Sequence, residues 1–143
     1  MNTINPYLNF EGHCEEAFNF YRSVFGGEFT QVSKFKDMPA EFPVSEAEKE
    51  KLMHIGLVIN KETIIHGSDI SAQYAGRFKM GTNISLTVNT DNKAEADRVF
   101  KALSAGGKVD MPMSDTFWGS YFGMFTDKFG IQWMISYEKP PVK

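Results

Sequence analysis

The sequence contains a single cysteine, no long apolar run and no cluster of basic side chains. Cys14 has no second cysteine with which to form an intramolecular disulfide, as is usual in a reducing compartment, so a cytoplasmic location is expected. The apolar runs are far shorter than the ~20 residues that span a bilayer, and no secretion signal is visible, so no membrane contact is expected. The net charge of −3, without a Lys/Arg footprint, argues against nucleic acid as a partner.

Aromatic residues, by contrast, are plentiful. They make up 14% of the 143 residues, with thirteen Phe against two Trp and five Tyr. The length is that of one domain, residues 1–143, which buries a sizeable core. Aromatic side chains fill such cores, and they also line clefts that bind small molecules.

The two halves of the sequence repeat one order of patterns. In each half a short strand pattern is followed by an amphipathic helical pattern, a Gly-Gly stop and enough chain for three more strands. We therefore expect two strand-helix-three-strand modules, about 1–70 and about 81–138, around a concave site. The matching segments are residues 4–10, 15–25 and Gly26-Gly27 in the first half, and residues 83–88, 94–103 and Gly106-Gly107 in the second.

Apolar spacing predicts which side of each helix is buried. The predicted stripes are Ala17, Phe20, Tyr21, Val24 and Phe25 in the first helix, and Ala96, Val99, Phe100 and Leu103 in the second.

Residues 37–52 have no counterpart in the second half. The segment from Ser45 to Glu48 has the pattern of a capping box and predicts a short charged helix that ends near Leu52. This insert is interpreted either as a lid, as a dimer contact or as a plain exposed connection.

Alternation along two strands of the second half separates an apolar face from a polar or mixed face. We expect the apolar face to pack under the helices and the other to form a cleft wall. The predicted apolar set is Ile84, Leu86, Val88, Trp133, Ile135 and Tyr137; the opposite set is Asn83, Ser85, Thr87, Gln132, Met134 and Ser136.

Two histidines are predicted to meet in the first half. A hairpin turn centred on Lys61 pairs residues whose numbers sum to about 122, so His54 and His66 share one face, directly opposite or one diagonal step apart. Gly56 beside them leaves room. A third metal ligand would have to come from Asp69 or from the insert. Hydrogen-bonded histidines are therefore favoured over metal ligands, and neither a metal nor another cofactor is expected.

Other chemistry-bearing residues are interpreted more simply. Trp118 and Phe122 could flank an aromatic or aliphatic ligand, although the core is the expected place for Phe122. Cys14 is predicted to be a small half-buried filler, and Asp127 to cap its own turn.

The motifs together resemble the PhnB-like branch of the vicinal-oxygen-chelate superfamily, which also holds glyoxalase I, fosfomycin-resistance enzymes, extradiol dioxygenases and bleomycin-binding proteins. The similarity covers essentially the whole chain. It implies an α+β fold in which two βαβββ modules form an open barrel-like mixed sheet with a central cleft, commonly as a homodimer. The motifs are Pro6-Tyr7-Leu8-Asn9-Phe10, Glu16-Ala17, Phe20-Tyr21, Phe25-Gly26-Gly27, Gly67-Ser68-Asp69, Trp118-Gly119, Phe122-Gly123 and Asp127 to Trp133.

The resemblance also implies where metal ligands would stand. In metal-dependent members they lie on the first and last strands of each module, which correspond here to Pro6, a position on or next to His66, Asn83 and Met134. Proline offers no side-chain ligand, asparagine is a poor one, methionine is wrong for a hard divalent ion, and only His66 could serve. The usual metal centre is therefore expected to be missing. No pattern resembles a site for S-adenosylmethionine, although members of this branch often carry a demethylubiquinone methyltransferase label.

Three functions follow as hypotheses. The first is a metal-free small-molecule-binding protein of the glyoxalase/bleomycin-resistance type, with an unknown, partly aromatic ligand. The second is a lyase- or transferase-type enzyme that uses His54 and His66, with or without a non-standard metal. The third is an assembly module that builds a homodimer through the insert and the exposed strand edges.

Overall fold

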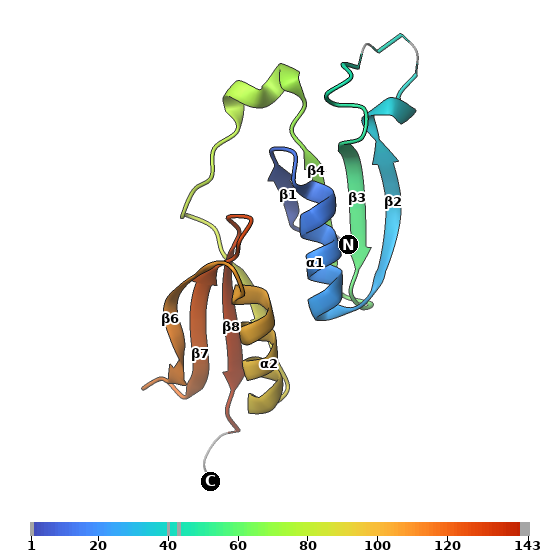
Figure 1. Ribbon diagram of the computed structural model, residues 1–143. Coiled ribbons are helices and arrows are strands. Elements are labelled where there is room, and N and C mark those ends of the chain that lie inside the picture. Colours follow the sequence, from blue (N-terminus) through green and yellow to red (C-terminus); the bar gives the residue numbers. More distant parts are fainter. Residues whose placement is uncertain (1, 40, 43, 141–143) are drawn as a thin grey trace. The chain divides into compact units, whose positions relative to one another are not determined.

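The computed structural model describes residues 2–39, 41–42 and 44–140. The chain divides into two compact units, Met1–Lys79 and Met80–Lys143. Each unit is one βαβββ module with one α-helix along a four-stranded mixed sheet (Figure 1). The predicted α+β class and the two modules are confirmed, with a separate sheet in each module. The expectations of a single domain and of a central cleft stay predictions.

The first module has the strand order β1-β4-β3-β2, with β1 parallel to β4 and the other pairs antiparallel. Its elements are β1 (Tyr7–Phe10), α1 (Cys14–Phe25), β2 (Glu28–Lys34), the 3-10 helix η1 (Phe35–Asp37), β3 (Leu52–Val58), β4 (Ile64–Asp69) and the 3-10 helix η2 (Ala72–Arg77).

The second module repeats this topology as β5-β8-β7-β6, again with its first pair parallel. Its elements are β5 (Leu86–Asn89), α2 (Lys93–Ser104), β6 (Lys108–Asp115), β7 (Ser120–Thr126) and β8 (Gln132–Glu138). No helix in the part of the chain that the structure describes is long and apolar enough to cross a membrane.

Helix α1 buries a stripe that differs from the predicted one at Phe18. Phe18 is fully buried, whereas Phe20 and Phe25 are only half-buried. The reason lies on β4, where Gly67 has no side chain and a Cβ atom there would lie 2.5 Å from Phe18 Cε1. The phenyl ring takes that space. Cys14, predicted to be half-buried, is fully buried and begins this stripe.

Asp69 holds the start of α1 against the sheet. Its Oδ1 accepts hydrogen bonds from the backbone N–H groups of Gly12 and Cys14, both at 2.9 Å, and its Oδ2 accepts from Leu52 N–H at 3.0 Å. The carboxylate is buried. It satisfies donors that a helix N-terminus leaves unpaired, and the side chain of His13 at the N-cap makes no such bond.

In the second module Asp127 performs a related task. Its Oδ1 accepts from Phe129 N–H at 2.8 Å and Ile131 N–H at 3.1 Å, and its Oδ2 accepts from Trp133 Nε1 at 2.8 Å. The prediction that Asp127 caps its own turn is confirmed. On the helix, Ala96, Val99 and Leu103 are buried as predicted, and Phe100 is half-buried.

The first strand of the second half was predicted from residue 83, which is too early. β5 begins at Leu86, and Ile84, which was expected to pack under a helix, is 73% exposed. Its backbone carbonyl instead accepts a hydrogen bond from Gln132 Nε2 at 2.8 Å. β7 begins at Ser120, because the preceding residues form a turn in which Thr116 Oγ1 accepts from Ser120 N–H.

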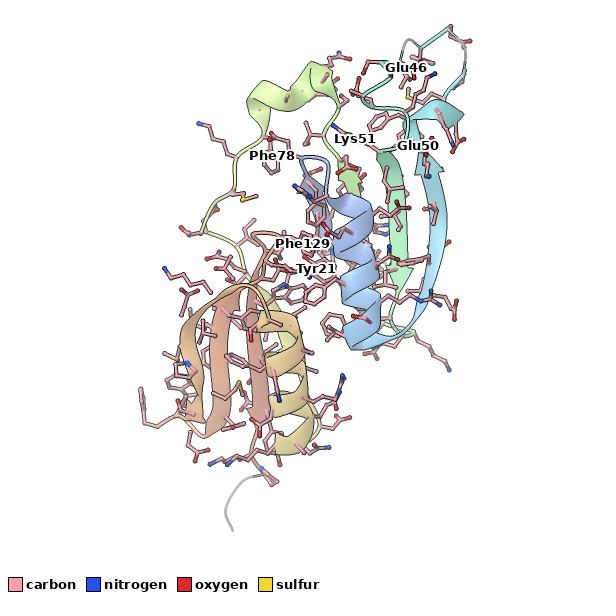
Figure 2. The ribbon with its side chains drawn as sticks, viewed as in Figure 1. Tyr21, Glu46, Glu50, Lys51, Phe78 and Phe129 are labelled. Atoms are coloured by element: carbon pink, nitrogen blue, oxygen red, sulfur yellow. The ribbon has the colours of Figure 1, made fainter. Side chains whose placement is uncertain are left out.

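The expected helix in the insert is wrong. Residues 46–50 form turns, and the segment pairs back on η1 through Phe35 N–H to Lys51 O at 3.1 Å. A short charged segment without an apolar stripe cannot offset the cost of helix nucleation. Glu50 forms ion pairs with Lys34, the last residue of β2, at 2.9 Å and with Lys36 at 3.0 Å (Figure 2). Residues 40 and 43 of the insert lie outside the described residues.

Candidate functional site

The first sheet has one face under α1 and one face turned away from it. Gly67 lies under Phe18 of α1, so His66 and Ser68, its neighbours along β4, point to the opposite side. Residues that pair directly across two strands lie on the same side of a sheet. His66 pairs with Tyr7 on β1 and with Gly56 on β3, so all three residues share one side. We call this surface face 1; it comprises Tyr7, Thr30, His54, Gly56, His66 and Ser68.

The two predicted histidines meet on face 1. The register pairs Gly56 with His66 and Val58 with Ile64. In both pairs the residue numbers sum to 122, as the turn predicts. His54 therefore lies one diagonal step from His66, with 5.4 Å between the ring centroids. The ring of Tyr7 lies 5.7 Å from His54 and 6.3 Å from His66, so three rings form one cluster.

Both ring nitrogens of His54 are hydrogen-bonded. Nε2 lies 3.2 Å from Oε1 of Gln31, and Nδ1 lies 3.3 Å from the hydroxyl of Tyr7. An amide oxygen only accepts, so Nε2 carries the proton, and Nδ1 accepts from the Tyr7 hydroxyl. Burial, followed by the proximity of His66, lowers the pKa of His54 below its ordinary value of 6.5. The imidazole is therefore neutral at physiological pH, in agreement with this pattern of donors and acceptors.

His66 has a different environment. Its Nδ1 is buried and has no hydrogen-bond partner among the described residues. A Cβ atom at Gly56 would lie 3.4 Å from this nitrogen and only 2.8 Å from Thr30 Cγ2. Glycine at position 56 therefore leaves the room beside His66 that the sequence predicted.

Gln31 was not predicted to belong to the site. The alternation of residues 28–36 is typical of a regular strand, but the β2–β3 pairing shifts register between Thr30 and Ser33. Gln31 has a φ of 54°, and it is the only non-glycine residue with positive φ in the described part of the chain. Glycine or asparagine would have signalled such a conformation, and neither stands here.

The donor set of the first module does not fit a hard divalent metal ion. His54 uses both nitrogens internally, and Asp69 is bonded to three backbone N–H groups on the side of the sheet under α1. Glu50 of the insert is paired with two lysines, which lower the pKa of its carboxyl to about 2. No group of three or more His, Cys, Asp and Glu side chains converges among the residues that the structure describes.

The positions that the resemblance assigns to metal ligands give the same result. The side chain of Pro6 has no ligand atom, and Asn83 lies exposed in a bend before β5. The sulfur of Met134 lies 3.8 Å from Thr87 Oγ1 and is too soft a donor for Mg²⁺ or Mn²⁺.

The second sheet carries the remaining candidates. Gly123 pairs with Ile135 and lies under Phe100 of α2, so Phe122 and Met134 point away from that helix. Phe122 is only half-buried rather than part of the core, and its ring lies 6.1 Å from the ring of Trp118, which is 55% exposed. Gln132 also lies on β8, whereas Asn83 and Ser85 precede β5. The role of these residues in binding stays a prediction.

Residues 2–136 match the model of a family described as 3-demethylubiquinone-9 3-methyltransferase. Among curated proteins, Protein YjdN of Escherichia coli K12 is 32% identical over 141 residues, which cover 95% of each chain.

Solved structures agree with this match. Protein PA1353 from Pseudomonas aeruginosa is similar with a TM-score of 0.87 and 39% identity over 98% of this chain and 100% of the other. A putative 3-demethylubiquinone-9 3-methyltransferase, PhnB protein, from Bacillus cereus has a TM-score of 0.77 and 27% identity over 95% and 99%. A glyoxalase/bleomycin resistance protein/dioxygenase family enzyme from Burkholderia phytofirmans PsJN has a TM-score of 0.61 and 18% identity over 93% and 97%, which shows the fold alone.

Proposed function

The chain belongs to the family described as 3-demethylubiquinone-9 3-methyltransferase, in the PhnB-like branch of the vicinal-oxygen-chelate superfamily, and we propose that it binds a small molecule on face 1 without the usual metal centre. One observation carries the proposal. A hydrogen-bonded row of Tyr7, His54 and Gln31 lies beside His66, whose Nδ1 is buried and has no partner among the residues that the structure describes. Binding sites for small molecules typically combine aromatic or apolar side chains with a few convergent polar groups.

The chemistry of face 1 defines the ligand class. An unpaired buried acceptor is tolerated more often than an unpaired buried N–H donor, which favours the His66 tautomer with its proton on Nε2. His66 then offers a donor, as does the amide nitrogen of Gln31, whose oxygen is occupied by His54. Tyr7 is 47% exposed and offers an aromatic ring. The ligand is therefore a small, partly aromatic molecule that carries an oxygen acceptor.

A thermal-shift screen tests this proposal. The set contains aromatic carboxylates, phenols, quinones and S-adenosylmethionine, the last because the family's description names methyl transfer. A ligand that binds the native state raises Tm with concentration. The shift should vanish in His66→Ala and persist in His13→Ala, since the His13 side chain is 67% exposed at the start of α1. A set without any shift, or an equal shift in His66→Ala, would contradict binding at face 1.

One observation favours an enzyme as the second candidate. His54 is neutral and its Nδ1 accepts from the Tyr7 hydroxyl, so as a general base it would take the proton of Tyr7. A lyase or transferase that used His54 and His66 would turn over a compound found in the screen. Its rate would fall as His54 becomes protonated, and His54→Gln would abolish that pH dependence. Binding without turnover would retire this candidate.

We also propose, from the resemblance, that the protein acts in the cytoplasm as a homodimer. Light scattering on the purified chain measures the mass in solution. A mass equal to one chain at every concentration would contradict the dimer.

A further inference from the structure

Gln31 combines two features that rarely occur together. Its backbone is in the left-handed region, which glycine, asparagine and aspartate tolerate better than glutamine. It also lies inside a strand, where a regular ladder needs no such conformation. Sparsely populated backbone conformations persist only where the surrounding structure holds them, and they cluster at active sites and ligand sites.

Packing of the side chain does not explain this conformation. Gln31 is exposed, and the next residue, Val32, is 50% exposed. The contact that Gln31 makes is polar, from its Oε1 to Nε2 of His54.

The register explains how the contact arises. Thr30 pairs with Gly56, and Ser33 pairs with His54, so residues 31 and 32 together stand opposite the single residue Ile55. This is a β-bulge with one extra residue. In a regular strand, the residue after Thr30 would point to the side under α1. The bulge and the left-handed backbone turn the side chain of Gln31 towards face 1, where its amide contacts His54.

We propose that Gln31 is a positioning residue of the ligand site, held by a strained bulge so that its amide fixes the orientation and the Nε2–H tautomer of His54. The fixed ring in turn directs its Nδ1 to the Tyr7 hydroxyl, so the row of three side chains keeps one arrangement. The significance for binding rests on the proposed function; the effect on the ring does not.

The test uses three variants and no ligand. Gln31→Gly removes the amide and relieves the backbone, Gln31→Glu keeps an acceptor at the same place, and Val32→Gly is the matched control one residue away. Nitrogen-15 NMR of the imidazole rings reports the tautomer, and thermal denaturation reports Tm. The wild-type protein should show a single Nε2–H tautomer for His54.

Gln31→Gly should convert the His54 signals to a mixture of tautomers, while its Tm stays equal to that of the wild type or rises, because glycine adopts positive φ freely. Val32→Gly should lower Tm and leave the tautomer unchanged, and Gln31→Glu should restore a protonated Nε2. An unchanged tautomer in Gln31→Gly, or a decrease in its Tm as large as that of Val32→Gly, would overturn the proposal. This test needs no ligand. A screen without any thermal shift would contradict the proposed function, whereas an unchanged tautomer in Gln31→Gly would contradict the positioning role.

Discussion

The imidazole rings of His54 and His66 lie 5.4 Å apart on adjacent strands, yet only His54 has both nitrogens hydrogen-bonded. His66 Nδ1 is buried without a partner among the described residues. The two histidines therefore differ in environment: His54 is held by Tyr7 and Gln31, whereas His66 is the residue that we propose to contact a ligand. Each of the following predictions tests a consequence of this arrangement or of the fold that supports it.

The unpaired nitrogen of His66 should cost stability. His66→Leu removes a buried polar atom that has no partner in the described part of the chain, and we expect the free energy of unfolding to rise by about 1 kcal/mol while binding is lost. Urea denaturation measures the change. His13→Leu, at a largely exposed position, should change stability by less than about 0.5 kcal/mol. A His66→Leu protein less stable than the wild type would show that the imidazole stabilises the fold.

The lowered pKa of His54 predicts a pH dependence of stability. Below pH 6.5 the unfolded chain binds a proton at His54 that the folded protein does not. The free energy of unfolding therefore decreases as the pH falls towards the folded-state pKa. His54→Gln should lose less stability than the wild type over that interval. Urea denaturation of both proteins from about pH 5 to pH 8 compares them. If the free energies of unfolding of the two proteins changed in parallel with pH, the lowered pKa of His54 would be contradicted.

The close approach of β4 to α1 predicts a severe effect at Gly67. In Gly67→Ala the new methyl group would lie 2.5 Å from Phe18 Cε1 and 3.0 Å from Leu8 O, and we expect a loss of about 1–3 kcal/mol or more. Gly76→Ala is the control, because nothing lies within 4 Å of a Cβ atom there and its φ is not positive. Equal stability of the two variants would mean that α1 can shift away from β4.

The donor set predicts that the purified, untagged protein carries no tightly bound metal. Elemental mass spectrometry should find far less than one equivalent per chain, because His54 is engaged and, within residues 2–39, 41–42 and 44–140, no group of three ligands converges. About one equivalent, lost in the His54→Ala/His66→Ala double variant, would overturn this account of the site.

The histidine pair could be predicted because it depends on local rules. Asn60 Oδ1 accepts hydrogen bonds from the backbone N–H groups of Glu62 and Thr63, and this tight turn fixes the register of β3 and β4. Side-chain parity then places His54 and His66 on one face. The duplicated order of patterns was equally local, and both modules formed as expected.

The features that sequence reasoning missed depend on tertiary contacts. Phe18 is buried because Gly67 lies under it, and the two residues are far apart in the chain. The bulge at Gln31 adds one residue to a strand, and nothing in the residue types marks the change of side. The insert carried a capping pattern without the apolar stripe that would have given a helix something to pack against.

The most direct test of the central claim is an NMR titration of the wild-type protein with the ligand that gives the largest thermal shift. If the ligand binds at face 1, the largest changes in backbone amide shifts should fall on Tyr7, Gln31, His54 and His66, and they should disappear in His66→Ala. Changes confined to residues 80–140, or changes that survive in His66→Ala, would contradict a binding site at face 1.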